Sequence, residues 1–516
     1  MAALRRAPAA QQSSTPPAHT IRLATKLDKL WEARVGVTTF RTTMAFANAT
    51  VIIGTHGKTL KGLNERDDGV YVLDALTGKV RTMIKPPGSG DLDVGGIAVD
   101  GDRVYFGTDN GWVVGASLSG NRLWSYQMQG KVRPAPALGD LNGDGQVDVV
   151  VGDEHGTLVA LDGATGKRLW QAQTSENDYS AKGFIAAAAI ADLDGDGKLD
   201  VVAGARDGVL TAYHGADGRV LWQAAHNSGM HASPQVADFD GDGRVEVLAA
   251  WSYSSLAVLD GETGNELWGQ TLSQDDGGIE GLFGTPVPLP GAPGVLIAPV
   301  AWWGKEDGVV GVGPLDRAFK TFEDRVSASA VVTDLDNDGV LEAIIGTEKG
   351  ALLALHADGG RAVLGTFPGG IEAPAMLADV DHDGRYELLV AARSGMLSCF
   401  RTGSTAKPFL ARFRGNDAHN RGDLGAVHLG WTAAAAMARP TTGMGSSQGS
   451  IRLDYLRCCT ALQQEAVRAP APQNQLLLEV AGRCNELAAK GTPRADAMRE
   501  VGRALGSQAP IPSECQ

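Results

Sequence analysis

The chain has 516 residues, a formal net charge of −14 and 43% hydrophobic residues. This length suits two domains or one large repeat array, and the composition is sufficient to bury a core. The acidic balance argues against a nucleic-acid partner, and no apolar run approaches the ~20 residues of a transmembrane helix.

The N-terminal residues 1–20 are rich in Ala, Pro, Gln and Ser without periodicity, so we expect them to be disordered. They hold two arginines but no apolar core of signal-peptide length, which predicts a removed signal or unconventional export. Residues 21–432 then repeat strand patterns with a period of about 45 residues, which indicates a β-propeller. Two early units cover 45–80 and 95–124, the second with a tight VDGDR turn.

Five copies of an acidic loop organise the rest of this region: DLNGDGQVD (140–148), DLDGDGKLD (192–200), DFDGDGRVE (238–246), DLDNDGVLE (334–342) and DVDHDGRYE (379–387). Each has oxygen side chains at positions 1, 3 and 5, a glycine at 6 and a carboxylate at 9. Calcium is a hard cation that takes six to eight oxygen ligands, and this spacing wraps oxygens around one ion. The alternative is five acidic turns without metal, and the fivefold recurrence favours calcium.

Position 7 contributes its backbone carbonyl, because its side chain varies freely. The sequence therefore predicts about five structural calcium sites. Their candidate ligands are Asp140, Asn142, Asp144, Gln146 and Asp148; Asp192, Asp194, Asp196, Lys198 and Asp200; Asp238, Asp240, Asp242, Arg244 and Glu246; Asp334, Asp336, Asp338, Val340 and Glu342; and Asp379, Asp381, Asp383, Arg385 and Glu387.

An EF-hand is the main competing interpretation of these loops. It needs flanking helices and a glutamate at position 12, where this chain has Val, Ala or Ile. Short β-branched runs such as VDVVVG and LEAIIG follow the loops and predict strands. We therefore expect each loop to join two strands.

The position 1 aspartates of successive loops are spaced by about one period, except between the third and fourth loops, where the gap is two periods. A degenerate unit around 282–302 fills this gap, and we expect no calcium there. The count predicts eight four-stranded blades, with seven as the alternative if one early unit is not a blade.

The outer turn of four units has its own signature, as in DGATGKRLW and DGETGNELW. Asp, Thr and Gly favour a turn, and the following Trp recurs once per unit. We expect these tryptophans to pack between neighbouring blades rather than to serve as ligand platforms. They are Trp124, Trp170, Trp222 and Trp268.

The inner half of each unit resembles the FG-GAP (integrin-α-like, VCBS) repeat with its DxDxDGxxD loop, and the outer half resembles the repeat of quinoprotein-type propellers. The resemblance covers about residues 25–415. It implies an all-β propeller of four-stranded antiparallel sheets, an extracellular setting and a binding or adhesion role, and it carries the calcium ligands onto the five loops above. Ring closure has two candidates, the Trp-bearing segment 26–36 and the segment FLARFRG at 409–415.

The C-terminal part changes character. Residues 433–450 have linker composition, and 451–516 show the spacing of three helices. We expect Cys484 to pair with Cys458 or Cys459 and Cys515 with the other, in an oxidising compartment. Calcium loops of this kind are also occupied mainly outside cells. The predicted location is therefore secreted, periplasmic or cell-surface.

The residue seven positions before each first loop aspartate enters an innermost strand, which would place Arg133, Ile185, His231, Ser327 and Glu372 around the central channel. We take three of them, Arg133, His231 and Glu372, as candidate ligand-binding residues. A polysaccharide lyase or hydrolase could use His231 or Glu372 to move a proton. A quinoprotein oxidoreductase is the weaker enzyme hypothesis, because the vicinal pair Cys458–Cys459 lies on a helical pattern.

The sequence thus favours a calcium-stabilised binding module for a carbohydrate or protein partner over an enzyme. No catalytic residue is assigned, and the ligand, the binding face and the oligomeric state stay open.

Overall fold

The computed structural model describes residues 27–429 apart from 59–66, 175–182, 227, 253–254, 272–280, 292–293, 302–307, 314–316, 323, 416–418 and 428, together with residues 480 and 503. The disorder expected for 1–20, the linker at 433–450 and the disulfides of the tail lie outside the described residues. The helical tail does too, except for Val480 and Arg503, which are both helical.

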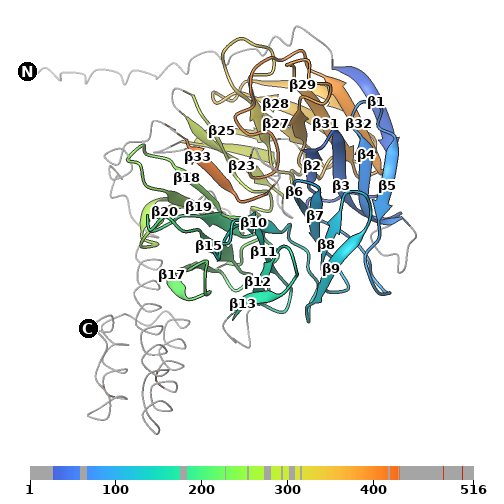
Figure 1. Ribbon diagram of the computed structural model, residues 1–516. Coiled ribbons are helices and arrows are strands. Elements are labelled where there is room, and N and C mark those ends of the chain that lie inside the picture. Colours follow the sequence, from blue (N-terminus) through green and yellow to red (C-terminus); the bar gives the residue numbers. More distant parts are fainter. Residues whose placement is uncertain are drawn as a thin grey trace, which may run out of the picture.

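Eight antiparallel sheets form the blades of a β-propeller, as the repeat count predicted (Figure 1). The first four blades are β2 Met44–Ala47, β3 Thr50–His56, β4 Asp68–Asp74 and β5 Val80–Ile84; β6 Ile97–Asp100, β7 Arg103–Gly107, β8 Trp112–Ser117 and β9 Arg122–Gln127; β10 Ala137–Gly139, β11 Asp148–Gly152, β12 Thr157–Asp162 and β13 Arg168–Gln173; β14 Ala189–Ala191, β15 Asp200–Gly204, β16 Val209–Tyr213 and β17 Val220–Ala225.

The other four blades are β18 Gln235–Asp238, β19 Glu246–Trp251, β20 Ser255–Asp260 and β21 Glu266–Thr271; β22 Val287–Leu289, β23 Val295–Val300, β24 Gly308–Val312 and β25 Arg317–Phe322; β26 Val331–Thr333, β27 Glu342–Gly346, β28 Ala351–Leu355 and β29 Arg361–Thr366; and β30 Met376–Ala378, β31 Glu387–Ala392 and β32 Met396–Arg401 with β1 Asp28–Arg34. The degenerate unit is therefore a complete sixth blade, β22 to β25.

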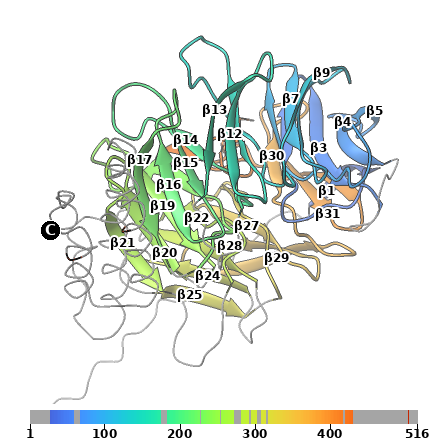
Figure 2. The same cartoon turned by 90° about the horizontal axis from the view of Figure 1, so that it is seen from below.

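Strand β1 settles how the ring closes. It pairs antiparallel with β32 and so becomes the outer strand of the eighth blade, although it comes first in the chain (Figure 1). Figure 2 shows it beside β31 of the same blade. Its Trp31 donates a hydrogen bond from Nε1 to the carbonyl oxygen of Ala75 in the first blade, at 2.8 Å. Of the two segments considered from the sequence, the N-terminal one closes the ring.

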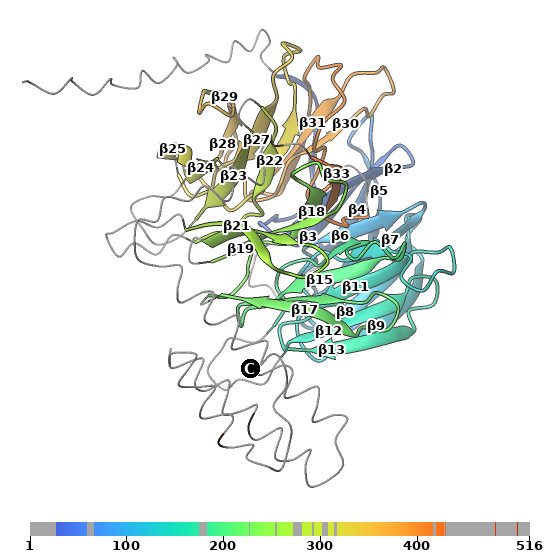
Figure 3. The ribbon, with the colours of Figure 1, turned by 90° about the vertical axis from the view of Figure 1, so that its left-hand side faces the viewer.

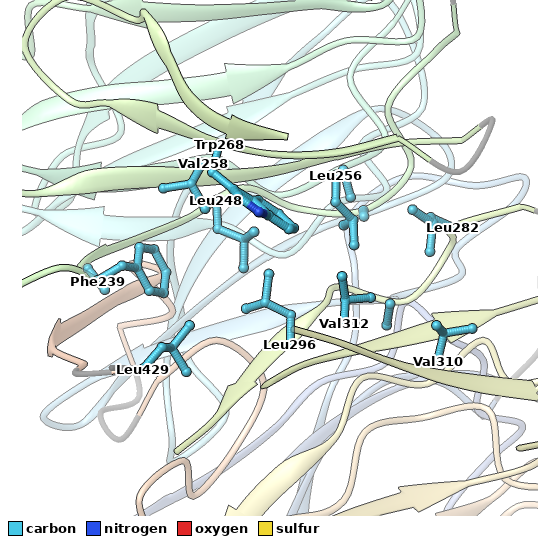
Figure 4. Packing of buried hydrophobic residues seen from close by; sticks show 14 of the residues in the cluster. Phe239, Leu248, Leu256, Val258, Trp268, Leu282, Leu296, Val310, Val312 and Leu429 are labelled. Carbon is cyan, nitrogen blue, oxygen red and sulfur yellow. The ribbon is translucent and has the colours of Figure 1, made fainter. Parts of the chain in front are cut away.

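Each outer-strand tryptophan packs at the interface between its own blade and the next, which confirms the expected packing. Trp124, Trp170 and Trp222 donate from Nε1 to backbone carbonyls of the following blade at 2.6 to 2.9 Å. The turn glycine of that next blade has positive φ and lies against the indole face. At Gly264 an added Cβ would lie 2.5 Å from the ring of Trp222, so a larger residue would not fit. Trp268 packs in the apolar cluster between the fifth and sixth blades (Figure 4).

The rival closing segment occupies the centre of the ring instead. Residues 409–415 and 419–427 (the plug) hydrogen-bond to the innermost strands of five blades: Leu410 with Val332, Ala411 with Leu377, His419 with Leu138, Arg421 with Ile190 and Gly422 with Val236. Strand β33, Asp423–Ala426, extends the fifth blade by parallel pairing with β18 (Figure 3).

Arg414 is the anchor of the plug. It is 1% exposed, and its Nη2 donates to the carbonyl oxygens of Ala188 and Pro234 at 2.7 and 2.8 Å. Complete burial lowers the pKa of Arg414 to about 9. The central channel is therefore filled by the chain's own backbone and one buried arginine.

Because β1 closes the ring, Trp31→Ala should cost about 3–5 kcal/mol of unfolding free energy, since it removes a buried indole at a blade interface. Urea unfolding of Trp31→Ala beside Trp222→Ala measures this, and the two losses should be similar. Exposed Lys29→Ala on the same strand is the control and should change stability by about 0.5 kcal/mol or less. A Trp31→Ala protein as stable as the control would mean that β1 does not close the ring.

Candidate functional site

The acidic loops join the innermost strand of a blade to the second strand, so they emerge from one end of the innermost strands. In each loop the carboxylate of position 1 accepts a hydrogen bond from the backbone N–H of the glycine at position 6, at 2.8 to 3.1 Å. The position 5 carboxylate accepts the N–H of position 7 at 2.8 Å in all five loops. The five loops therefore share one backbone conformation.

Position 9 is the first residue of the second strand in all five blades, and its side chain is buried. Asp148, Asp200, Glu246, Glu342 and Glu387 are at most 3% exposed. Each accepts a hydrogen bond from the backbone N–H of position 2. Burial raises the pKa of Asp148 and Asp200 to about 6 and of Glu246 and Glu387 to about 7, with neighbouring loop aspartates adding to the rise.

Four of the loops bring one oxygen each from positions 1, 3 and 9 within 4.8 Å of one another, close enough to hold a metal ion. These groups are Asp192, Asp194 and Asp200; Asp238, Asp240 and Glu246; Asp334, Asp336 and Glu342; and Asp379, Asp381 and Glu387. The first loop has Asn142 at position 3, which offers an amide oxygen in place of a carboxylate.

The fourth loop shows most directly that its donors suit a cation. Oδ1 of Asp336 is buried and has no hydrogen-bond partner among the described residues. Burial, with Asp338 and Asp334 nearby, raises the pKa of Asp336. Glu342 is held from its other side by His356, whose Nε2 lies 2.8 Å from Oε1. An unpaired buried carboxylate oxygen is costly, and a bound cation would satisfy it.

Positions 5 and 7 have different parts in these loops. The position 5 residues Asp144, Asp196, Asp242, Asp338 and Asp383 cap the backbone of their own loop. The side chains of position 7 (Gln146, Lys198, Arg244, Val340 and Arg385) are all exposed, which leaves only their backbone carbonyls to face an ion.

A pocket lies at the other end of the innermost strands, because its residues precede those strands whereas the acidic loops follow them. It is built from the connections that lead into six of the eight blades, and Phe413 of the plug also lines it. Of the five residues expected around the channel, Arg133, Ile185, His231 and Ser327 line this pocket.

Glu372, the fifth of these residues, does not line the pocket. It is 8% exposed, and its Oε1 accepts a hydrogen bond from Nη1 of Arg393 at 2.7 Å. Burial raises the pKa of Glu372 against the opposing effect of Arg393. The turn between β31 and β32 thus supplies a partner that the sequence spacing did not reveal.

Arg133 is fully engaged by acidic neighbours. Its guanidinium donates to both oxygens of Asp109 at 3.0 to 3.2 Å and also pairs with Glu154. Lys131 donates to Asp91 and Asp109 at 2.8 Å each. Burial by itself would raise the pKa of Asp109, but the hydrogen bonds from Arg133 and Lys131 outweigh it and lower that pKa.

The sequence did not predict this network. Asp91, Asp93 and Asp109 also lie close enough together for a metal, but the Lys131 ammonium already bridges two of them. No single motif marks the cluster, because its members come from different connections and meet only in the folded ring.

His231 is held neutral in the pocket. Its Nδ1 lies 2.6 Å from Oγ of Ser252, and its ring packs 4.6 Å from that of Phe283. Burial, followed by the charges of Arg206 and Arg41, lowers the pKa of His231 to about 4. At neutral pH the imidazole is therefore uncharged.

Arg41 is the pocket residue that sequence reasoning missed. It precedes the first blade, which has no acidic loop, so counting back from a loop aspartate could not reach it. Burial and the nearby Arg133 lower the pKa of Arg41 to about 10, which still leaves it charged at neutral pH. Its Nε and the hydroxyl of Ser327 are buried polar atoms without a hydrogen-bond partner among the described residues, and such atoms typically cost about 1–3 kcal/mol each.

Comparisons with known proteins agree with this architecture. Residues 24–204 match the family described as outer membrane protein assembly factor BamB, and residues 192–249 match the FG-GAP-like repeat. The chain is an eight-bladed β-propeller that combines PQQ-like and FG-GAP-like repeats. No curated protein matches the sequence significantly.

Three solved structures illustrate the similarity. BamB from Moraxella catarrhalis is 18% identical with a TM-score of 0.50, and the match covers 73% of this chain and 99% of that one. Quinohemoprotein alcohol dehydrogenase ADHIIG from Pseudomonas putida HK5 is 14% identical with a TM-score of 0.51, over 75% and 78% of the two chains. Sqt1 from Saccharomyces cerevisiae is 12% identical with a TM-score of 0.56, over 73% and 99%. At these identities the shared feature is the fold.

Proposed function

We propose that this protein is a calcium-stabilised β-propeller whose pocket-bearing face binds a protein partner outside the cytosol. The observation that carries the proposal is the blind pocket at the channel mouth. It is lined by Arg41, Arg133, His231, Phe283 and Phe413. Arginine and aromatic side chains are the residues that most often dominate protein interfaces, and the plug prevents a ligand from passing through the ring.

Calcium has a structural part in this proposal. The oxygens of positions 1, 3, 5 and 9 and the carbonyl of position 7 would hold the ion, and its charge would offset the repulsion between buried and clustered carboxylates. The loops and the pocket lie at opposite ends of the innermost strands, so the ion would support the blades without touching the ligand. At a free calcium concentration ten to a hundred times the Kd of a site, calcium would add about 1.4–2.7 kcal/mol per site to the free energy of unfolding.

A location outside the cytosol fits both the calcium loops, which often need high calcium, and the similarity to BamB. Among the described residues, no helix has the length and apolar character needed to cross a bilayer. A carbohydrate ligand and lyase chemistry remain the alternatives. Proton transfer in a lyase would have to use His231, since Glu372 is paired with Arg393.

The role of calcium predicts a large fall in melting temperature on chelation. Thermal unfolding in calcium and in excess EGTA measures it, with magnesium as the control ion. Several sites of about 1.4–2.7 kcal/mol each could together rival the 5–15 kcal/mol stability of a typical domain. An identical melting temperature in both buffers would contradict calcium binding by the loops.

Asp336→Asn should have opposite effects on stability in the two buffers. With EGTA the variant should be more stable than the wild type, because it removes a half-buried charge that lies close to Asp334 and Asp338. With calcium it should be less stable, by about 1–3 kcal/mol, because one site loses a ligand charge. Exposed Asp102→Asn, in the turn that replaces the acidic loop in the second blade, should give the same small change in both. A loss of stability of equal size in both buffers would contradict the assignment of Asp336 as a metal ligand.

The binding face can be tested by photo-crosslinking with the full chain. Benzoylphenylalanine placed at Ser394, beside the pocket-side turn of the eighth blade, should crosslink a protein from the extracytosolic fraction of the source cells. The same probe at Val340, in an acidic loop, should not give that product.

Gels containing acidic or neutral polysaccharides, assayed for retardation and for cleavage products, test the carbohydrate alternative. Retardation without a protein crosslink would contradict the proposal, and released product would favour the lyase.

A further inference from the structure

The pocket at the channel mouth has hydrogen-bonding capacity that the protein itself does not use. Among the described residues, Nε of Arg41 and Oγ of Ser327 are both buried without a partner. Ser327 is 7% exposed, so solvent reaches little of it except through the pocket. These two donors come from the connections into the first and seventh blades, and both line the same cavity.

Arg41 differs from its neighbour Arg133 in what surrounds the guanidinium. Arg133 pairs with Asp109 and Glu154. The guanidinium of Arg41 forms no ion pair of this kind within the described part of the chain, although Asp109, Glu154 and Asp93 act on it from a greater distance. The ring of Phe40 lies 5.1 Å from its guanidinium carbon. Arg41 is therefore the cation of the pocket that is left to bind an anion.

The remaining lining residues also favour an anion. None of the described residues that line the pocket is an aspartate or a glutamate. His231 does not add to this preference: the Ser252 hydroxyl donates to the carbonyl oxygen of Gly229 and accepts from Nδ1–H of His231, so Nε2 of the neutral ring is a hydrogen-bond acceptor and the anion must be held by Arg41 and Ser327. Arg41 and Arg206 both act electrostatically on this imidazole, and the carboxylates that act on Arg41, which are Asp109, Glu154 and Asp93, do not line the pocket.

The shape of the walls narrows the class of anion. Phe40 and Phe283 both line the cavity and meet edge to face, with ring centroids 6.5 Å apart, and Phe413 of the plug also lines it. A single guanidinium with a nearby hydroxyl matches the two oxygens of a planar carboxylate. A dianionic phosphate would need more positive charge, and the aromatic walls favour an apolar or flat group beside the carboxylate.

We propose that this pocket is a binding site for a carboxylate group, which Arg41 and Ser327 hold while Phe40 and Phe283 contact the apolar body attached to it. This inference deepens the proposed function, because it rests on the pocket-bearing face being the binding face. The carboxylate could belong to the C-terminus of a protein chain, to an acidic sugar or to a small organic acid.

Ligand-observed NMR titration of the calcium-loaded full chain tests the site. The probes are N-acetylphenylalanine for a chain terminus, galacturonate for an acidic sugar and phenylacetate for a small acid. N-acetylphenylalanine amide is the uncharged match and should bind at least tenfold more weakly than the acid. Binding by any one of the three acids supports the proposal, and the tightest of them identifies the source of the carboxylate.

Three variants connect the binding to the named residues. Arg41→Met should weaken binding of the acid at least tenfold, and Ser327→Ala should weaken it about threefold. Arg168→Met, at an exposed arginine on β13, is the matched control and should bind like the wild type. Melting temperatures in calcium check that the variants fold. If Arg41→Met does not fold, Ser327→Ala still tests the site.

Equal binding of the acid and its amide would overturn the inference. So would acid binding that survives both pocket variants, or the lack of binding by all three acids. Phenyl phosphate bound more tightly than phenylacetate would overturn the choice of a carboxylate. The crosslinking result at Ser394 is independent of these probes: a partner crosslinked there without carboxylate binding would leave the proposed function standing and remove only this inference.

Discussion

Closure of the ring is the constraint on which the rest of the structure depends. A blade buries its apolar faces only against two neighbours, so eight blades in a row would leave two of them uncovered. Strand β1 prevents this by completing the last blade from the first residues of the propeller. Trp31 then makes the same indole-to-carbonyl contact with the first blade that Trp124, Trp170 and Trp222 make at other interfaces.

The same geometry separates two kinds of chemistry. In a closed ring every innermost strand runs in the same direction relative to the disc. All segments that follow these strands therefore gather on one face, and all segments that precede them gather on the other. The acidic loops belong to the first group and the pocket residues to the second. A change in a loop can thus alter the stability of a blade without altering the residues at the pocket.

The plug gives the pocket its floor. Innermost strands expose unpaired backbone groups toward the channel, and the described residues of the plug satisfy several of them in five blades. The cost of this arrangement is a buried arginine, Arg414, whose guanidinium donates to carbonyl oxygens and lies over the ring of Phe413. By filling the centre, the segment converts an open channel into a blind depression, which suits recognition of one end of a ligand.

The sequence by itself determined the blades, the acidic loops and the outer tryptophans. These features are local: a nine-residue loop or a Thr-Gly-Trp turn is specified by its own residues, and its recurrence gives the architecture. The predicted spacing also brought Arg133 and His231 to the pocket. It also placed Glu372 ahead of the innermost strand of the eighth blade, but it did not predict the hydrogen bond from Arg393, which lies on a turn of the same blade that the spacing does not describe.

Only the tertiary structure decided which segment closes the ring, what fills its centre and which cation of the pocket is left without a carboxylate. Segments 26–36 and 409–415 have similar strand patterns, and local propensity does not distinguish an outer strand from a central plug. Arg41 and Arg133 are equally plain arginines in the sequence. They differ because Asp109 and Glu154, from two other connections, reach Arg133, and that proximity exists only once the blades have closed into a ring.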